Sequence, residues 1–216
     1  MKKFILPLLL LLFVGSIMAV ESEPSAVVGY VKYDCVAGLN YIALPMESGY
    51  TWVSEFADTY MGSFDALSYW DNATQQWVGA IDLGYWEGDF AIEPGAVLMV
   101  NAVAPLSAYS IGDMPAENAA YSLLPGLNSL MIPLNKSSIT MASVLADTEI
   151  GYGSLDAISY WDNASQQWVG AIDLGYWEGD FATSIGMPLF VNSLITGTWP
   201  EGPRGFESGL SKSAKK

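Results

Sequence analysis

The stretch SYWDNATQQWVGAIDLGYWEGDFA at residues 68–91 occurs a second time, as SYWDNASQQWVGAIDLGYWEGDFA, at residues 159–182. The two 24-residue copies differ only where Thr74 stands opposite Ser165. In each copy, two aromatic-rich alternating runs flank Asn-Ala-Thr-Gln or Asn-Ala-Ser-Gln, which is the spacing of a β-hairpin. Asp71 and Asp162 are expected to accept backbone N–H groups two residues further on and so to close the turns.

Looser similarity extends the repeat on both sides of this block. GLNYIALPM at 38–46 corresponds to GLNSLMIPL at 126–134. The short β-prone runs VGYVKYDCV at 28–36 and NAAYSLL at 118–124 precede them, and VLMVNAV at 97–103 follows the block in the first copy. Each copy also holds one segment with apolar residues at helical spacing, for which Thr51 and Ser138 are the expected N-caps. The sequence therefore predicts a mainly β fold of two tandem homologous modules, each β-sandwich or barrel-like with one short helix, at 28–115 and 116–203.

Two questions about the repeat stay open at this level. A single sandwich-like body with approximate two-fold symmetry and two separate beads both fit the sequence. The uneven divergence fits either recent gene conversion or a requirement that both copies keep the same surface. Only the second explanation of the divergence implies function.

The N-terminal residues have the pattern of a secretory signal. Lys2 and Lys3 form a basic start, residues 4–14 are mostly apolar, and small residues lead to Ala19. A membrane anchor is the alternative, but a span needs about 20 apolar residues. We expect a signal peptide over 1–19, a short segment over 20–27, and a secreted or cell-surface protein that meets a membrane only through the signal before cleavage.

Charge is distributed unevenly along the chain. Between Val20 and Pro203 only Lys32 and Lys136 are basic, against 22 acidic residues, which gives 2 − 22 = −20. Four basic residues lie in the tail at 204–216, which we expect to be flexible. The negative body would repel phosphate backbones, so nucleic acid is not an expected partner. The tail either pairs with the body of a neighbouring copy, which would build filaments or layers, or has no partner.

The sequence offers few of the residue combinations that enzymes use for catalysis. The chain has no histidine, which excludes Ser-His-Asp and Cys-His catalysis and histidine metal sites. A glycosidase with paired carboxylates would require two equal active sites in small modules. Cys35 is the single cysteine and has no partner for an intramolecular disulfide, so we expect a buried, small apolar residue in the first strand. We predict that the protein is not an enzyme.

The repeated tryptophans are candidates for carbohydrate binding, because flat indole faces stack on sugar rings. Asp71, Asn72, Gln75 and Gln76 are the candidate polar partners in the first copy. The alternative is that the tryptophans form the module cores, where aromatic rings bury large areas. The ligand-binding candidates are Trp70, Asp71, Gln76, Trp77, Trp86, Trp161, Asp162, Gln167, Trp168 and Trp177.

The Trp-Glu-Gly-Asp-Phe loops supply candidate calcium ligands, because calcium prefers several oxygen ligands on flexible loops. The spacing matches no established calcium loop, and acidic turns are common. The candidate ligands are Asp82, Glu87 and Asp89 in the first copy and Asp173, Glu178 and Asp180 in the second.

The order Gly-Leu-Asn-x-x-x-x-Pro, short helix, Tyr-Trp-Asp-x-x-x-x-x-Trp hairpin and Pro-Gly strand resembles the "GWNLISLP" type of β-repeat module of bacterial secreted and cell-surface proteins. The resemblance covers nearly the whole chain after the signal, and it implies a structural module with no particular chemistry. The hairpin alone also resembles a Kelch-blade corner, but two copies cannot close a propeller.

Two classes of function follow from these observations. The first is a structural or adhesive protein that self-associates through its duplicated modules. The second is a bivalent carbohydrate-binding protein that recognises an extracellular glycan through two equal hairpins.

Overall fold

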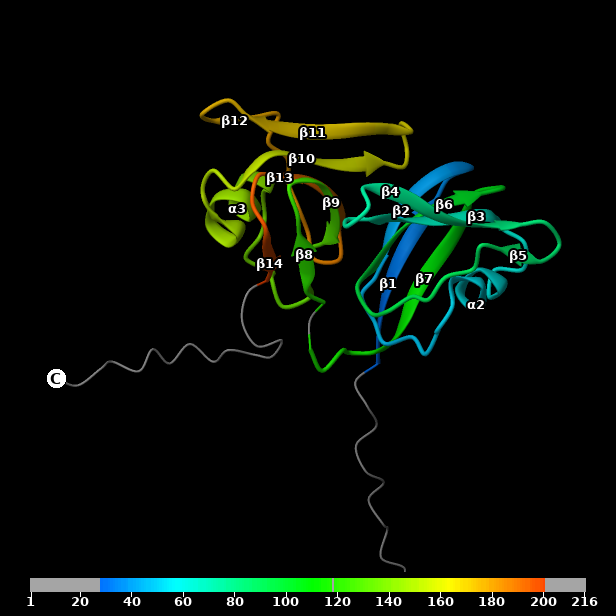
Figure 1. Cartoon of the computed structure of the whole chain (residues 1–216). Helices are drawn as coiled ribbons and strands as arrows, with labels where there is room; N and C mark the ends of the chain where they lie inside the picture. The colour runs from blue at the N-terminus through cyan, green and yellow to red at the C-terminus, as the bar shows by residue number, and fades with distance from the viewer. Residues whose placement is uncertain (1–27, 118, 201–216) are drawn as a thin grey trace, which may run out of the picture.

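The computed structural model describes residues 28–117 and 119–200 (Figure 1). The predicted mainly β fold is confirmed, with 50% of residues in strands and 9% in helices. The predicted signal peptide, the segment 20–27 and the basic tail at 204–216 lie outside the described residues. Within the described residues, no helix is long and apolar enough to cross a membrane.

Module 1 is built on a five-stranded antiparallel sheet whose spatial order is β2-β6-β3-β4-β5. The repeated hairpin supplies its central and outer strands, with Trp70 opposite Trp77 and Asp71 opposite Gln76 in the register. The strands are β2 (Gly38–Leu44), β3 (Phe64–Asp71), β4 (Gln76–Asp82), β5 (Trp86–Glu87) and β6 (Ala96–Ala102).

Module 2 repeats this sheet with the order β9-β13-β10-β11-β12. Its hairpin has the same register, because Trp161 lies opposite Trp168. Both sheets carry a register shift at the start of the hairpin, at Phe64/Ala66 and Leu155/Ala157. The strands are β9 (Gly126–Met131), β10 (Leu155–Asp162), β11 (Gln167–Asp173), β12 (Trp177–Glu178) and β13 (Pro188–Ser193).

Each module also has a two-stranded ribbon. In module 1 the ribbon pairs β1 (Val28–Cys35) with β7 (Leu106–Asp113), and in module 2 it pairs β8 (Tyr121–Leu123) with β14 (Gly197–Trp199). The sequence indicated β1 and β8 but gave no expectation for β7 or β14. Cys35 is buried in β1 as predicted, and burial raises the pKa of its thiol to about 11, so the thiol is protonated at neutral pH.

The expected helices form, but with different starts and shapes. Helix α2 (Val53–Asp58) has Trp52 rather than Thr51 at the N-cap, because the Glu55 carboxylate accepts the backbone N–H groups of both residues. Helix α3 (Ala142–Val144) starts after Met141 rather than Ser138 and continues as the π-helix η1 (Leu145–Gly151). Each helix buries its apolar side against the inner face of its own sheet, where Phe56 and Leu145 are fully enclosed.

The outer faces of the two sheets pack against each other along β2, β6, β9 and β13. Successive residues of a strand point to opposite faces, so Ile42 lies in the core of module 1 while Tyr41 and Ala43 lie in a separate core between the modules. That core also contains Val97, Met99, Met131 and Phe190. The two modules therefore form one body with a shared core.

Candidate functional site

The hairpin turns of the identical block close as predicted from the sequence. The Asp71 carboxylate accepts the Ala73 N–H at 2.9 Å and the Thr74 hydroxyl at 2.7 Å. These hydrogen bonds lower the pKa of the Asp71 carboxyl group, the larger contribution coming from Thr74. The backbone of Gln75 adopts a positive φ of 57°, so its side chain leaves the turn toward the other module.

The tip of the first hairpin binds the free edge of the second sheet. The Gln75 side chain accepts the Leu127 N–H at 2.9 Å and donates to the Leu127 carbonyl oxygen at 2.6 Å. The Trp70 indole N–H donates to the same carbonyl oxygen at 3.0 Å, and the Asn72 amide oxygen accepts the Ser129 N–H at 2.8 Å. Side chains thus satisfy backbone groups that an edge strand would otherwise expose. We call these contacts the clasp.

The second hairpin makes the same clasp on the first sheet. Gln166 accepts the Leu39 N–H at 2.9 Å, Trp161 donates to the Leu39 carbonyl oxygen at 3.0 Å, and Asn163 accepts the Tyr41 N–H at 2.9 Å. Equivalent residues therefore contact each other's modules, which is the rule of an interface with two-fold symmetry. Gly38 makes room for this contact, because a β-carbon there would lie 2.7 Å from the Gln166 amide oxygen.

The clasp uses several residues that the sequence suggested for ligand binding. Trp70 and Trp161 donate their indole N–H groups across the interface, and Asp71 and Asp162 hold the turns. Gln76 and Gln167, the glutamines in the candidate set, are exposed, whereas the glutamines just before them form the clasp. A sequence pattern of two adjacent glutamines does not distinguish the one that turns inward.

The second half of the block anchors the helix of its own module. The Trp86 indole N–H donates to Asp58 at 2.9 Å, and Trp177 does the same with Asp147 at 3.2 Å. Asp89 accepts the backbone N–H of Ser54 at 3.1 Å and its hydroxyl at 2.6 Å, which caps the first turn of α2 from another loop. Asp180 and Ser143 form the equivalent pair, so these tryptophans and aspartates have structural roles.

The candidate calcium ligands do not converge in the described residues. No group of three or more His, Cys, Asp or Glu side chains lies close enough there to hold a metal ion. Asp82 accepts the Gly84 N–H at 2.7 Å, and Asp89 faces the helix. Calcium binding by Asp82, Glu87, Asp89 and by their counterparts Asp173, Glu178 and Asp180 stays a prediction.

Replacing Asp89 with alanine tests the capping role against a calcium role. We expect the free energy of unfolding to fall by about 0.5–2 kcal/mol, which is the usual cost of losing a cap. The loss should be the same in calcium and in a chelator, as measured by urea denaturation. A loss seen only in calcium would assign Asp89 to a metal site instead.

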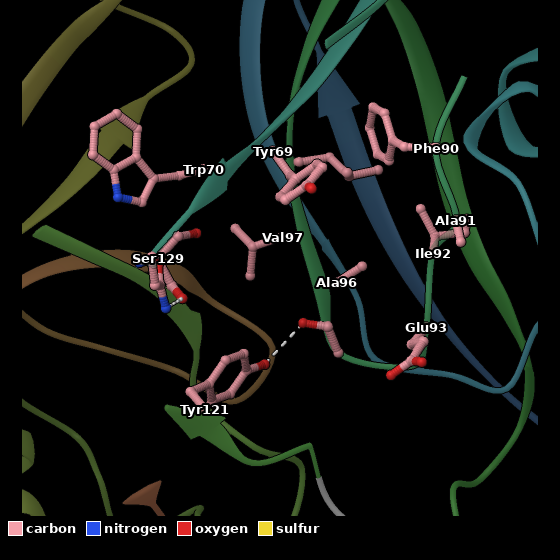
Figure 2. Close-up of a pocket in the computed structure, with 13 residues that line it drawn as sticks. Tyr69, Trp70, Phe90, Ala91, Ile92, Glu93, Ala96, Val97, Tyr121 and Ser129 are labelled. Atoms are coloured by element: carbon pink, nitrogen blue, oxygen red, sulfur yellow. Dashed lines mark hydrogen bonds between the residues drawn. The ribbon is translucent and has the colours of Figure 1, made fainter. Parts of the chain in front are cut away.

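Two hollows flank the clasp at the module interface. Figure 2 shows the first, a pocket of about 330 Å³ between Tyr69 and Trp70 of the hairpin and Tyr121 and Ser129 of module 2. The Tyr121 hydroxyl crosses to the Gly95 carbonyl oxygen at 2.9 Å. One polar group of the pocket, the Tyr121 hydroxyl, is thus already hydrogen-bonded across the interface.

The counterpart pocket of about 300 Å³ is lined by the equivalent hairpin residues Tyr160 and Trp161. The charges of the two pockets differ, because Glu93 lines the first whereas Lys32 and Ser184 line the second. The pair therefore does not offer two equal binding sites.

Each hairpin also has an apolar surface on its outer side, whose residues take no part in the clasp or the helix anchors. In the first hairpin Trp77, Ile81, Leu83 and Tyr85 are between 43% and 64% exposed. In the second hairpin Trp168, Ile172, Leu174 and Tyr176 are between 44% and 64% exposed. We call each set of four residues a stripe. The alternation of β4 and β11 places the first two residues of each stripe on one side of the hairpin, and Leu83 and Leu174 follow directly after these strands.

Comparison of the chain with protein-family models, with curated proteins and with solved structures finds no match. The function therefore has to be inferred from the site itself.

The two stripes meet in an aromatic pocket between the modules. The pocket measures about 300 Å³ and is lined by Trp70, Trp77, Leu127, Ser159, Trp168 and Phe190. The Phe190 ring lies 5.7 Å from the Trp77 ring and 5.2 Å from the Trp168 ring between centroids, with both indoles steeply inclined to it. Trp77 and Trp168 are thus the tryptophans of the candidate set that keep half-exposed rings.

Proposed function

We propose that this chain is a non-enzymatic, secreted or cell-surface protein with a structural or adhesive role, which self-associates through the two stripes. The observation that carries the proposal is the exposure of eight large apolar side chains in the identical block. Exposed apolar patches of soluble proteins mark interaction surfaces. A role inside the fold accounts for the clasp and the helix anchors, but it does not account for the stripes.

The geometry of the stripes favours assembly over a single closed contact. Each hairpin strand runs about 13 Å from its tryptophan to its isoleucine at about 3.3 Å per residue, and the leucine follows directly after the strand. The stripes start at the shared pocket and end in the loops before β5 and β12, which lie toward opposite ends of the molecule (Figure 1). One molecule therefore presents two similar surfaces, and a chain with two such surfaces can contact two neighbours.

The bivalent glycan alternative has less support from the contacts. Three of its four polar partners are used within the fold, because Asp71 closes the turn and Asn72 and Gln75 form the clasp, whereas Gln76 stays exposed. The half-exposed rings of Trp77 and Trp168 line one pocket rather than two. Self-association is therefore the preferred function.

The test introduces charge into both stripes with the double substitution Ile81→Lys and Ile172→Lys. Sedimentation velocity over a range of protein concentrations should show association of the wild type, and the double variant should stay monomeric. The free energy of unfolding should change little, because both side chains are more than half exposed.

The matched control is Met61→Lys with Tyr152→Lys. These equivalent residues are 93% and 80% exposed and lie outside the stripes. The control adds the same charge, so it should associate as the wild type does. A wild type that stays monomeric at all concentrations, or a control that dissociates equally, would overturn the proposal.

A further inference from the structure

The aromatic pocket between the modules forms where the two stripes meet, and the packing of the fold leaves the rings of Trp77 and Trp168 half exposed there. Phe190 of β13 is nearly buried, and three indoles stand around it, each steeply inclined to its plane. The interplanar angles to Phe190 are 76° for Trp70, 70° for Trp77 and 78° for Trp168, at centroid distances of 5.7, 5.7 and 5.2 Å. Two of the indoles come from one module, and the third comes from the other.

This arrangement is not required by the repeat. The position equivalent to Phe190 in module 1 is Met99, so the phenyl ring stands on one side of the approximate two-fold axis. Phe190 also stacks on Tyr41 at 5.5 Å, which fixes its ring from the interface side. The pocket is therefore a single, asymmetric feature with rings held by packing.

The polar inventory of the lining narrows the class of ligand. Ser159 supplies a hydroxyl group, Trp77 and Trp168 each carry an indole N–H, and the Trp70 N–H is already donated to Leu127. A sugar ring would have few hydrogen-bond partners for its hydroxyl groups, and burying unpaired polar groups is unfavourable. A bare metal ion would find no carboxylate among these residues, and an anion would find no lysine or arginine.

A quaternary ammonium group suits the same lining. Its positive charge is spread over methyl groups that need no hydrogen bonds, and it is attracted to aromatic faces within about 6 Å of the ring centroid. The field of the body adds to this attraction, because residues 20–203 carry 2 basic and 22 acidic side chains. Both the rings and the net charge therefore favour a cation of low hydration.

We infer that the pocket of Trp70, Trp77, Trp168 and Phe190 binds a trimethylammonium group, either in free choline or in a choline lipid headgroup. The inference does not rest on self-association, because Ile81→Lys and Ile172→Lys lie outside the pocket lining. At protein concentrations at which the wild type is monomeric, that double variant should bind as the wild type does, which separates the failure of one proposal from the failure of the other.

The experiment is isothermal titration with choline chloride, with tryptophan fluorescence as a second readout. The neutral isostere 3,3-dimethyl-1-butanol and sodium chloride are the ligand controls. We expect saturable binding of choline and at least tenfold weaker binding of the isostere. Trp168→Leu, which keeps apolar volume but removes the π face, should weaken choline binding by about tenfold or more.

The control variant is Trp52→Leu, which replaces an indole of similar exposure outside the pocket and should bind choline as the wild type does. Circular dichroism checks that each variant is folded. Phe190→Met, which introduces the residue found at the equivalent position of module 1, serves as a second pocket variant. Equal binding of choline and the isostere, no binding of either, unchanged binding by both pocket variants, or binding of a glucose oligomer instead would overturn the inference.

Vesicles distinguish the two sources of the group. Co-sedimentation with phosphatidylcholine vesicles but not with phosphatidylglycerol vesicles, reversed by free choline, would identify a lipid headgroup. Binding of free choline without co-sedimentation would identify a soluble ligand, and either result supports the pocket.

Discussion

Phe190→Ala is expected to lower the free energy of unfolding by about 3–5 kcal/mol, the usual cost of truncating a buried phenylalanine. The ring contacts four others, those of Tyr41, Trp70, Trp77 and Trp168, and it belongs to the core between the modules. Its loss removes buried apolar surface and leaves a cavity that rings from both modules cannot fill. Urea denaturation followed by circular dichroism measures the change.

The matched control is Phe190→Met, which keeps most of the volume and should cost less than about 1.5 kcal/mol. The wild type should unfold in one transition, because the two modules share this core. A loss below about 1 kcal/mol in Phe190→Ala, together with two separate transitions in the wild type, would mean that the modules are independent.

The second large effect is expected from Gln75→Ala combined with Gln166→Ala. The two side chains make four hydrogen bonds between the modules, and each bond contributes about 0.5–1 kcal/mol where water can reach it. The double variant should therefore lose about 2–4 kcal/mol in urea denaturation. The positive φ at both positions contributes little to the difference, since alanine and glutamine tolerate it similarly.

Gln76→Ala with Gln167→Ala is the matched control for the clasp. These glutamines are the next residues along the chain and are exposed. Their replacement should change the free energy of unfolding by less than about 0.5 kcal/mol. Equal losses in the two double variants would show that the clasp does not hold the modules together.

Local chemistry made part of this molecule predictable from the sequence. Alternating residues and a turn closed by Asp71 are short-range signals, and the structure has the hairpin and the turn hydrogen bonds. The duplication predicted two similar sheets for the same reason. Helix starts were less predictable, since Glu55 rather than Thr51 sets the first turn of α2.

The interface between the modules could not be predicted in this way. Whether Gln75 or Gln76 turns inward depends on the backbone at the end of a four-residue loop. One face of β2 packs in the core of module 1, and its other face is buried only because the two sheets meet there. In the sequence, Tyr41 is an ordinary residue of an alternating strand, so nothing marks it as part of the interface. Strand β7 was missed because its alternation is interrupted by small and polar residues such as Ser107, Ser110 and Gly112.

The structure separates the identical block into parts with different roles. The clasp and the helix anchors require identity for internal reasons, because each hairpin serves an equivalent place in the fold. In the stripes, Trp77 and Trp168 also pack against Phe190. The other six stripe residues take no part in the clasp or the helix anchors, and they are where a requirement for the same outer surface would act. The functional surface is therefore narrower than the whole block.

Hydroxyl-radical footprinting of the wild type at low and high protein concentration tests the role of the stripes most directly. Self-association through the stripes predicts that Trp77, Leu83 and Tyr85 lose reactivity as the protein assembles, together with their counterparts in the second hairpin. Met61 and Tyr152 should stay reactive throughout, as internal controls outside the stripes. Assembly that leaves the stripe residues as reactive as in the dilute protein would contradict the account.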